Sequence, residues 1–318
     1  MHRIAMKDPF HSTEQVFDAD NKGKLLGVKN DPHIPVSWIR QLKEKGYFLH
    51  TVDHKSAGGR AVDLQLVNPL TGRWMSGSSS GTAVNVFLGM NDVGIGTDGG
   101  GSVLAPAMSL NLFGFISPLL CGEWMKQFAK TSTDGITFTP SIGFITGEWE
   151  MMKQIIRDTM VLPGTGRNPV ILAQHENFPF PVKKTSFPDI YGSREECIPF
   201  LRENLAEADL IVSEEGPVDL LTYGDTVMGH FDETTHAMQR KSGKGLLRCV
   251  NMAGASALCI PNGKLGCGTV LICRSEPEEI AMMIQTAENL VCERDALCIR
   301  YFQNPDTWCA DGFEGGSV

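Results

Sequence analysis

The spacing of apolar residues along the chain indicates several amphipathic helices. Val36, Ile39 and Leu42 recur every three or four residues, which places them on one face of a helix. Ser275 and Glu278 have the spacing of a capping box, in which two side chains satisfy the first free N–H groups of a helix. Together these patterns predict helices over residues 35–46, 81–90, 148–160, 194–207 and 275–292.

Short apolar runs lie between these helical segments and predict strands over residues 47–52, 169–173, 210–212, 257–260 and 269–273. Helices that alternate with such strands are typical of an α/β fold whose sheet is covered on both faces. We therefore expect a central mixed, mostly parallel sheet. No Pro-, Gly- or Ser-rich linker divides the sequence, so residues 1–318 are predicted to form one domain.

Charge and hydropathy exclude several classes of function. The net charge is −9 and no Lys/Arg-rich patch occurs, which argues against a nucleic-acid surface and against binding to anionic membranes. No apolar run reaches about 18 residues, the length needed to span a bilayer. The first residues lack the apolar core of a signal peptide, so we expect a cytoplasmic protein.

The nine cysteines favour the same compartment. Their number is odd, and most lie in apolar stretches, as reduced thiols that pack as small hydrophobic side chains do. No CxxC pair occurs, and the pair His175-Glu176 has no second ligand pair at a suitable spacing. The sequence therefore predicts no metal site.

Glycine and serine concentrate between residues 76 and 102, where three interpretations compete. Gly94 to Gly99 fits GxGxxG, but neither a good strand before it nor an acidic residue about 20 positions after it supports a dinucleotide site, and we expect no cofactor. Residues 77–81 fit GxSxG centred on Ser79, which would need a histidine partner. Turn-forming glycines with polar capping serines are the third interpretation. The histidines available to a Ser79 triad are His175, His230 and His236.

Two serine motifs occur together in this region, and their separation is informative. Ser76-Gly77-Ser78-Ser79-Ser80-Gly81 precedes Gly96-Thr97-Asp98-Gly99-Gly100-Gly101-Ser102, and Ser78 and Ser102 are 24 residues apart. The pair resembles the amidase signature family, whose members carry GGSSGG, then a stretch of small apolar residues, then GTDxGGS. The resemblance extends to Asn68-Pro69, Leu26-Gly27-Val28-Lys29-Asn30, Pro106-Ala107, Gly114-Phe115, residues 134–158, Asn251-Met252-Ala253-Gly254, Pro261-Asn262-Gly263 and residues 271–290.

This resemblance implies a Ser–cis-Ser–Lys catalytic unit. Carried over position by position, Ser102 is the nucleophile, Ser78 is the bridging serine after a cis peptide bond, and Lys29 is the base. A serine hydroxyl needs a base to become a good nucleophile, and a lysine whose pKa is lowered by burial can supply one. We therefore expect an amidohydrolase that cleaves the C–N bond of linear amides through an acyl-enzyme.

The glycine run before the nucleophile has an expected role of its own. The backbone N–H groups around Gly99, Gly100 and Gly101 are predicted to hold the oxyanion, because glycine permits close approach of a substrate. Ser79 and Thr97 are expected to support this network, and Asp98 to order the loop.

The sequence also departs from the family pattern. Leu104 stands where the family has an arginine, and Ser80 replaces a glycine. Only 49 residues separate Lys29 from Ser78, because a Gly- and Thr-rich loop after the lysine is missing. The region 160–209 is shortened as well, which predicts an open pocket.

Three other functions stay open at this point. A non-catalytic relative that keeps the fold is one, and a partner-dependent subunit of a glutamine-dependent amidotransferase is another. The Ser79 histidine triad is the third. The partners expected are a small-molecule amide and either a second copy of the chain or a partner subunit.

Overall fold

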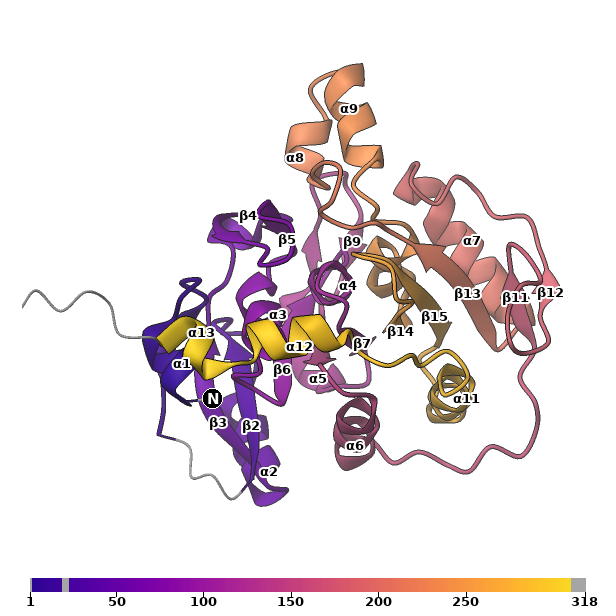
Figure 1. Ribbon diagram of the computed structural model, residues 1–318. Helices are drawn as coiled ribbons and strands as arrows, with labels where there is room; N and C mark the ends of the chain where they lie inside the picture. The colour runs from indigo at the N-terminus through magenta and orange to yellow at the C-terminus, as the bar shows by residue number, and fades with distance from the viewer. Residues whose placement is uncertain (1, 19–22, 310–318) are drawn as a thin grey trace, which may run out of the picture.

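An eleven-stranded mixed sheet runs through the computed structural model, which describes residues 2–18 and 23–309 (Figure 1). β2 pairs in parallel with β3 and β6, and β11 does so with β12 and β13. The other six of the ten pairings are antiparallel. The strand order of the main sheet is β1 (Thr13–Val16), β3 (Tyr47–Asp53), β2 (Lys24–Lys29), β6 (Val93–Asp98), β10 (Ser141–Thr146), β7 (Phe113–Ser117), β14 (Ala255–Pro261), β15 (Gly268–Arg274), β13 (Leu210–Glu215), β11 (Ile171–Ala173) and β12 (Lys183–Lys184).

The predicted α/β class and mixed sheet are confirmed, whereas the expectation of a mostly parallel sheet is wrong. Parallel neighbours need a long crossover, and short connections such as the one between β14 and β15 produce antiparallel pairs instead. The alternation of helices and strands in the sequence does not distinguish these two cases.

Helices cover both faces of the sheet, as expected. One buried apolar cluster lies under α1, α3, α4, α7 and α10, and a second lies under α2, α5, α6 and α11. The helices are α1 (His2–Lys7), α2 (Val36–Glu44), α3 (Ser80–Phe87), α4 (Leu104–Ser109), α5 (Gly122–Met125), α6 (Trp149–Thr159), α7 (Arg194–Glu207), α8 (Thr226–Gly229), α9 (Glu233–Arg240), α10 (Val250–Ala253), α11 (Pro277–Ala287), α12 (Ala296–Phe302) and α13 (Pro305–Cys309).

Three peripheral features complete the fold. α8 and α9 project from the top of the molecule in Figure 1, and α13 returns to contact α1. Two small sheets, β4 (Val62–Val67) with β5 (Trp74–Ser76) and β8 (Lys130–Thr131) with β9 (Thr137–Phe138), lie outside the main sheet. The organisation as one domain stays a prediction, which the continuous sheet supports. Among the described residues, no helix has the length and apolarity to cross a bilayer.

Two local details differ from the sequence predictions. α11 begins after Glu276 without a side-chain cap, and Ser275 Oγ instead donates to the carbonyl of Gly254 at 2.9 Å, so the predicted capping box is absent. The GxGxxG run is largely strand β6, whose six residues are all buried. Its glycines allow helix α3 to pack closely on the strand, because a Cβ on Gly94 would lie only 2.4 Å from Thr82 Cγ2.

The close packing of α3 on β6 predicts a strong effect of Gly94→Ala. The added methyl group would overlap Thr82, and forced overpacking of a core costs about 1–3 kcal/mol. We expect urea unfolding to show a loss of that size. Gly164→Ala is the matched control, since nothing lies within 4 Å of a Cβ there. Equal effects of the two substitutions would contradict the packing argument.

Candidate active site

Lys29 is a buried lysine at the carboxyl end of β2, between β3 and β6. Only 2% of the residue is exposed. Its Nζ donates to Ser78 Oγ at 2.7 Å and to Thr97 Oγ1 at 2.8 Å. The structure therefore brings together one lysine and one serine of the predicted unit, which lie 49 residues apart in sequence.

A carboxylate that the sequence analysis missed lies beside this lysine. Asp31 Oδ2 accepts a hydrogen bond from Thr97 Oγ1 at 2.8 Å and lies 3.7 Å from Lys29 Nζ. Lys55 Nζ approaches the same oxygen at 3.2 Å. Burial alone would raise the pKa of Asp31, but Lys29, the N–H of His33 and Lys55 hold that pKa below its usual range. The only sequence signal for Asp31 is its position two residues after Lys29, just past the strand end.

The electrostatic environment of Lys29 favours its neutral form. Burial lowers the pKa of Lys29 to about 7, because a charged ammonium is poorly solvated there. Asp31 and Asp98 oppose this shift, whereas Lys55 and Lys130 add to it. A substantial fraction of Lys29 is therefore neutral near neutral pH, which is the form that accepts a proton.

Ser78 and Ser79 lie in a turn between β5 and α3. Among the described residues, the one cis peptide bond precedes Pro217, so the bond between Gly77 and Ser78 is trans, and the predicted cis geometry is wrong for this structure. Gly77 has a φ of +82°, a backbone conformation open to glycine, and this turn directs Ser78 to Lys29 instead. Ser79 is fully buried, and its N–H donates to the carbonyl of Ser102 at 3.3 Å.

Asp98 orders the loop that carries the nucleophile candidate. Its Oδ1 accepts from the N–H of Gly101 at 2.7 Å, and its Oδ2 accepts from the N–H of Val103 at 2.6 Å. This engagement removes Gly101 from the predicted set of oxyanion donors. Within the described part of the chain, the N–H groups of Gly99, Gly100 and Ser102 make no hydrogen bond. Gly99 and Gly100 thus keep their predicted availability, and Ser102 adds a donor that the sequence analysis did not name.

Ser102 lines a cavity of about 640 Å³ together with Lys29, Ser78 and Thr97. Its hydroxyl makes no hydrogen bond to any described residue, so the contact between Ser102 and Ser78 is not closed in this structure. Catalytic hydrogen bonds are often open in ligand-free enzymes and shorten when substrate binds. The cavity therefore brings together all three members of the predicted unit, with the Lys29–Ser78 contact already formed.

Two of the departures from the family pattern, Leu104 and Ser80, have structural explanations. Leu104 is fully buried in the apolar cluster under α4, and a Cβ on Gly114 would lie 3.4 Å from its Cδ2. Ser80 Oγ donates to Asp63 Oδ2 at 2.6 Å at the start of α3. Leucine thus contributes packing where the family has a charge, and serine adds a polar anchor.

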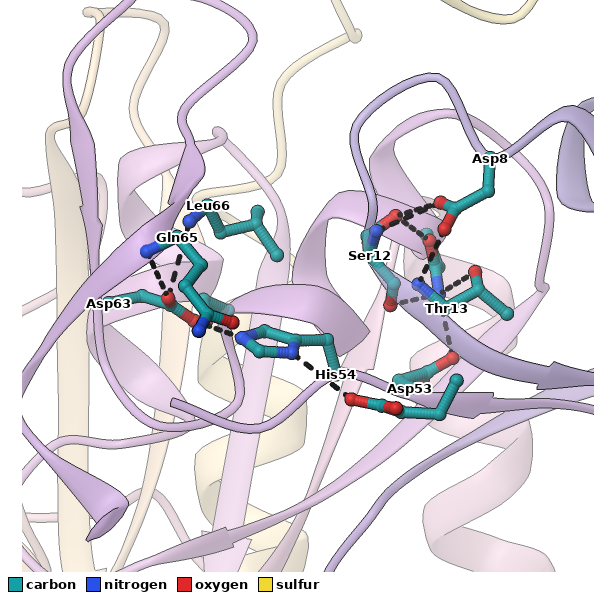
Figure 2. Close-up of polar contacts among 11 residues, drawn as sticks. Asp8, Ser12, Thr13, Asp53, His54, Asp63, Gln65 and Leu66 are labelled. Atoms are coloured by element: carbon teal, nitrogen blue, oxygen red, sulfur yellow. Dashed lines mark hydrogen bonds and ion pairs between the residues drawn. The ribbon is translucent and has the colours of Figure 1, made fainter. Parts of the chain in front are cut away.

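The anchor at Ser80 belongs to a network centred on His54. Figure 2 shows the His54 ring directed at Asp63, whose Oδ1 accepts from the N–H groups of Gln65 and Leu66. His54 Nε2 lies 3.1 Å from Asp63 Oδ2, and its Nδ1 lies 3.2 Å from Glu14 Oε1. An imidazolium can form ion pairs with both carboxylates, whereas a neutral ring carries no charge to pair with them. The contact with Asp63 raises the pKa of His54, and Glu14 contributes.

The histidines required by the GxSxG alternative lie elsewhere. His175 pairs with Glu214 at 3.1 Å and stacks on Phe178, and neither His230 nor His236 lines the cavity. Within residues 2–18 and 23–309, no group of three or more His, Cys, Asp or Glu side chains is arranged to hold a metal ion. All nine cysteines are unpaired.

Comparison with known proteins gives a consistent result. The family model described as Amidase matches residues 60–118, which contain both serine motifs. A glutamyl-tRNA(Gln) amidotransferase subunit from Thermotoga maritima aligns over 91% of this chain and 90% of its own, with 16% identity and a TM-score of 0.64. An amidase aligns over 91% and 94% with 14% identity and a TM-score of 0.61. A 6-aminohexanoate cyclic dimer hydrolase aligns over 91% and 92% with 12% identity and a TM-score of 0.58.

A search of curated proteins by sequence finds no significant match. The predicted resemblance to the amidase signature family is confirmed by the family model over the motif region, and the structural neighbours share the fold across most of the chain. A chain of 318 residues is consistent with the prediction of a shortened member.

The His54 network predicts that stability depends on pH. Its folded-state pKa is raised, so its contribution is complete below the unfolded value of about 6.5 and is lost as pH rises through the folded pKa. We expect His54→Gln to reduce the free energy of unfolding more at pH 6 than at pH 9. His236→Gln, on exposed helix α9, is the control and should show no such difference. A His54→Gln effect that is independent of pH would contradict the charged network.

Proposed function

We propose that this chain hydrolyses the C–N bond of a small linear amide through a serine acyl-enzyme. The observation that carries the proposal is the contact of 2.7 Å between the buried Nζ of Lys29 and Ser78 Oγ, in a cavity that Ser102 also lines. The cavity volume of about 640 Å³ suits a small molecule.

In the first half of the reaction, neutral Lys29 accepts the proton of Ser78 Oγ, and Ser78 takes the proton of Ser102 Oγ. The Ser102 oxygen bonds to the amide carbon, and the carbonyl electrons move onto its oxygen. The N–H groups of Gly99, Gly100 and Ser102, which make no hydrogen bond within the described residues, would donate to this oxyanion. The C–N bond then breaks, and the leaving nitrogen takes a proton back through Ser78.

In the second half, the same groups act on water. Lys29, through Ser78, removes a proton from a water molecule as its oxygen bonds to the acyl carbon. The bond to Ser102 Oγ breaks, the serine regains a proton, and the carboxylic acid leaves. Thr97 and Asp31 keep Lys29 Nζ directed at Ser78 throughout, because Thr97 Oγ1 joins the ammonium to the carboxylate.

The alternatives from the sequence are less well supported. A non-catalytic relative would have no reason to keep a buried lysine in contact with a serine, since removing an ammonium from water is costly. None of the three histidines available to a Ser79 triad lines the cavity, His33 at the cavity pairs with Asp31 at 3.1 Å, and Ser79 is fully buried. A partner subunit remains compatible with the proposal, because it would supplement the site without replacing it.

Reaction with a fluorophosphonate probe tests the nucleophile. We expect Ser102→Ala to abolish labelling, and Lys29→Ala and Ser78→Ala to slow it by about a thousandfold or more, since each interrupts the proton relay. Ser186→Ala, which lies outside the cavity, should label like the unmodified protein. The proposal is wrong if Ser102→Ala labels as fast as that control, as determined by intact-protein mass spectrometry.

The charges around Lys29 predict how the rate of labelling varies with pH. The rate should rise as Lys29 loses its proton, with a midpoint near the pKa of about 7. Asp31→Asn removes a charge that raises this pKa, so the midpoint should move to lower pH. Lys55→Gln removes a charge that lowers it, so the midpoint should move to higher pH. Shifts in the same direction, or none, would exclude Lys29 as the titrating base.

A further inference from the structure

A second buried cation lies beside the loop that carries Ser102. Arg194 is the first residue of α7, directly after its N-cap Ser193, and only 8% of it is exposed. The first turn of a helix disfavours positive charge, because the helix dipole is positive there. Helix formation therefore does not account for an arginine at this position, and its contacts must be considered separately.

One edge of the Arg194 guanidinium is bound to a carboxylate, and the other edge makes only one weak contact. Nε and Nη2 approach Asp134 Oδ2 at 2.7 and 2.6 Å. Nη1 has only the sulfur of Met252, at 3.6 Å, and a thioether is a weak acceptor. The same Nη1 lies 3.1 Å from the position that a Cβ on Gly100 would occupy. The free edge thus faces the nucleophile loop, and Arg194 lines the same cavity as Ser102.

A neighbouring arginine keeps Arg194 in place. Arg248 Nη2 donates to the carbonyls of Gly192 and Ile190, in the segment that leads into α7. Arg248 also lines the cavity, and its own carbonyl oxygen lies 3.6 Å from the position of a Cβ on Gly100. Arg248 therefore contacts both the segment that leads into α7 and the loop that carries Ser102, and Asp134 holds the guanidinium of Arg194.

The charge balance of the cavity is opposite to that of the whole chain, whose net charge is −9. Cationic side chains outnumber acidic ones along its wall even when Lys29 is counted as neutral, and a positive lining attracts anions. Asp134, which pairs with Arg194, and Asp219, beside Lys244, offset part of this charge from outside the lining. Besides Lys29, the lining holds the cations Lys55, Arg60, Lys130, Arg194, Lys244 and Arg248, against the acids Glu14, Asp31, Asp98 and Asp225.

We propose that the substrate is an amide that carries a carboxylate, and that the free edge of Arg194 binds this carboxylate beside the nucleophile loop. A guanidinium edge with unsatisfied N–H groups matches a carboxylate, and a charged hydrogen bond in a partly closed cavity is stronger than a neutral one. This inference deepens the proposed function, on which it rests, by assigning its site a chemical class of substrate.

Matched pairs of substrates test the inference. Succinamate and succinamide differ only in a carboxylate on the acyl side, and N-acetylglycine and N-acetylglycinamide differ in the same way on the amine side. We expect kcat/KM to favour the anionic member of at least one pair by about tenfold or more, at constant ionic strength. Arg194→Gln should reduce that preference to within about threefold, mainly through KM, and Arg194→Lys should restore part of it.

Arg202→Gln is the control on the same helix. Arg202 donates to the carbonyl of Met252 at 2.9 Å and does not line the cavity, so its substitution should leave the preference intact. If Arg194→Gln lowers kcat/KM equally for the anionic and the neutral member, Arg194 has a structural role only and the inference is overturned. It is also overturned if the unmodified protein does not prefer the anionic member of either pair, which needs no variant to fold.

Fluorophosphonate labelling of Ser102 separates this inference from the proposed function. We expect succinate to slow labelling of the unmodified protein, and chloride at equal ionic strength not to do so. Protection that persists in Arg194→Gln, or no protection at all, contradicts the carboxylate site while labelling still supports the nucleophile. Failure of Ser102 to label would instead contradict the proposed function.

Discussion

Burial of the Lys29 side chain is the constraint on which the rest of the site depends. Removing an ammonium from water is expensive, and the cost falls only if polar partners surround it or the group loses its proton. Both conditions are met: Ser78, Thr97 and Asp31 surround the ammonium, and burial lowers the pKa of Lys29 to about 7. Ser78, Thr97 and Asp31 come from three separate segments, so the position of Lys29 fixes how those segments meet.

These segments can pack this closely only because glycines stand where any side chain would overlap a neighbouring segment. A Cβ on Gly96 would lie 2.5 Å from Ser79 Oγ, and one on Gly77 would lie 2.5 Å from Pro106 Cδ. The glycines of β6 and of the turn before α3 thus let the two serine motifs pack against each other and against β2. The GxGxxG run, which in sequence resembles a dinucleotide-binding loop, is explained by the close packing of the strand that carries Thr97 and Asp98.

Sequence patterns predicted the elements better than their arrangement. The helix at 194–207 has the predicted limits, and the strand at 47–52 is one residue longer than predicted, because both depend on local apolar spacing. Strand direction depends on long-range pairing that local spacing does not encode, so the proportion of parallel strands was predicted wrongly. Lys29, Ser78 and Ser102 could be named because the paired motif is specific. Asp31, Lys55 and Arg194 could not, since each acquires its role only through contacts between distant segments.

The cations of the cavity lower the pKa of Lys29 and also attract anions, and these two effects oppose each other unless the anion binds far from Lys29. Lys55 and Lys130 help to keep Lys29 neutral, whereas a bound anion close to Lys29 would raise its pKa and protonate the base. An anionic substrate is therefore compatible with this mechanism only if its charge is held away from the lysine. Arg194 meets this condition, because it approaches the nucleophile loop at Gly100 and is not among the charges that most shift Lys29. Asp31 raises the pKa of Lys29, and the nearby cation Lys55, 3.2 Å from the same carboxylate oxygen, opposes that effect.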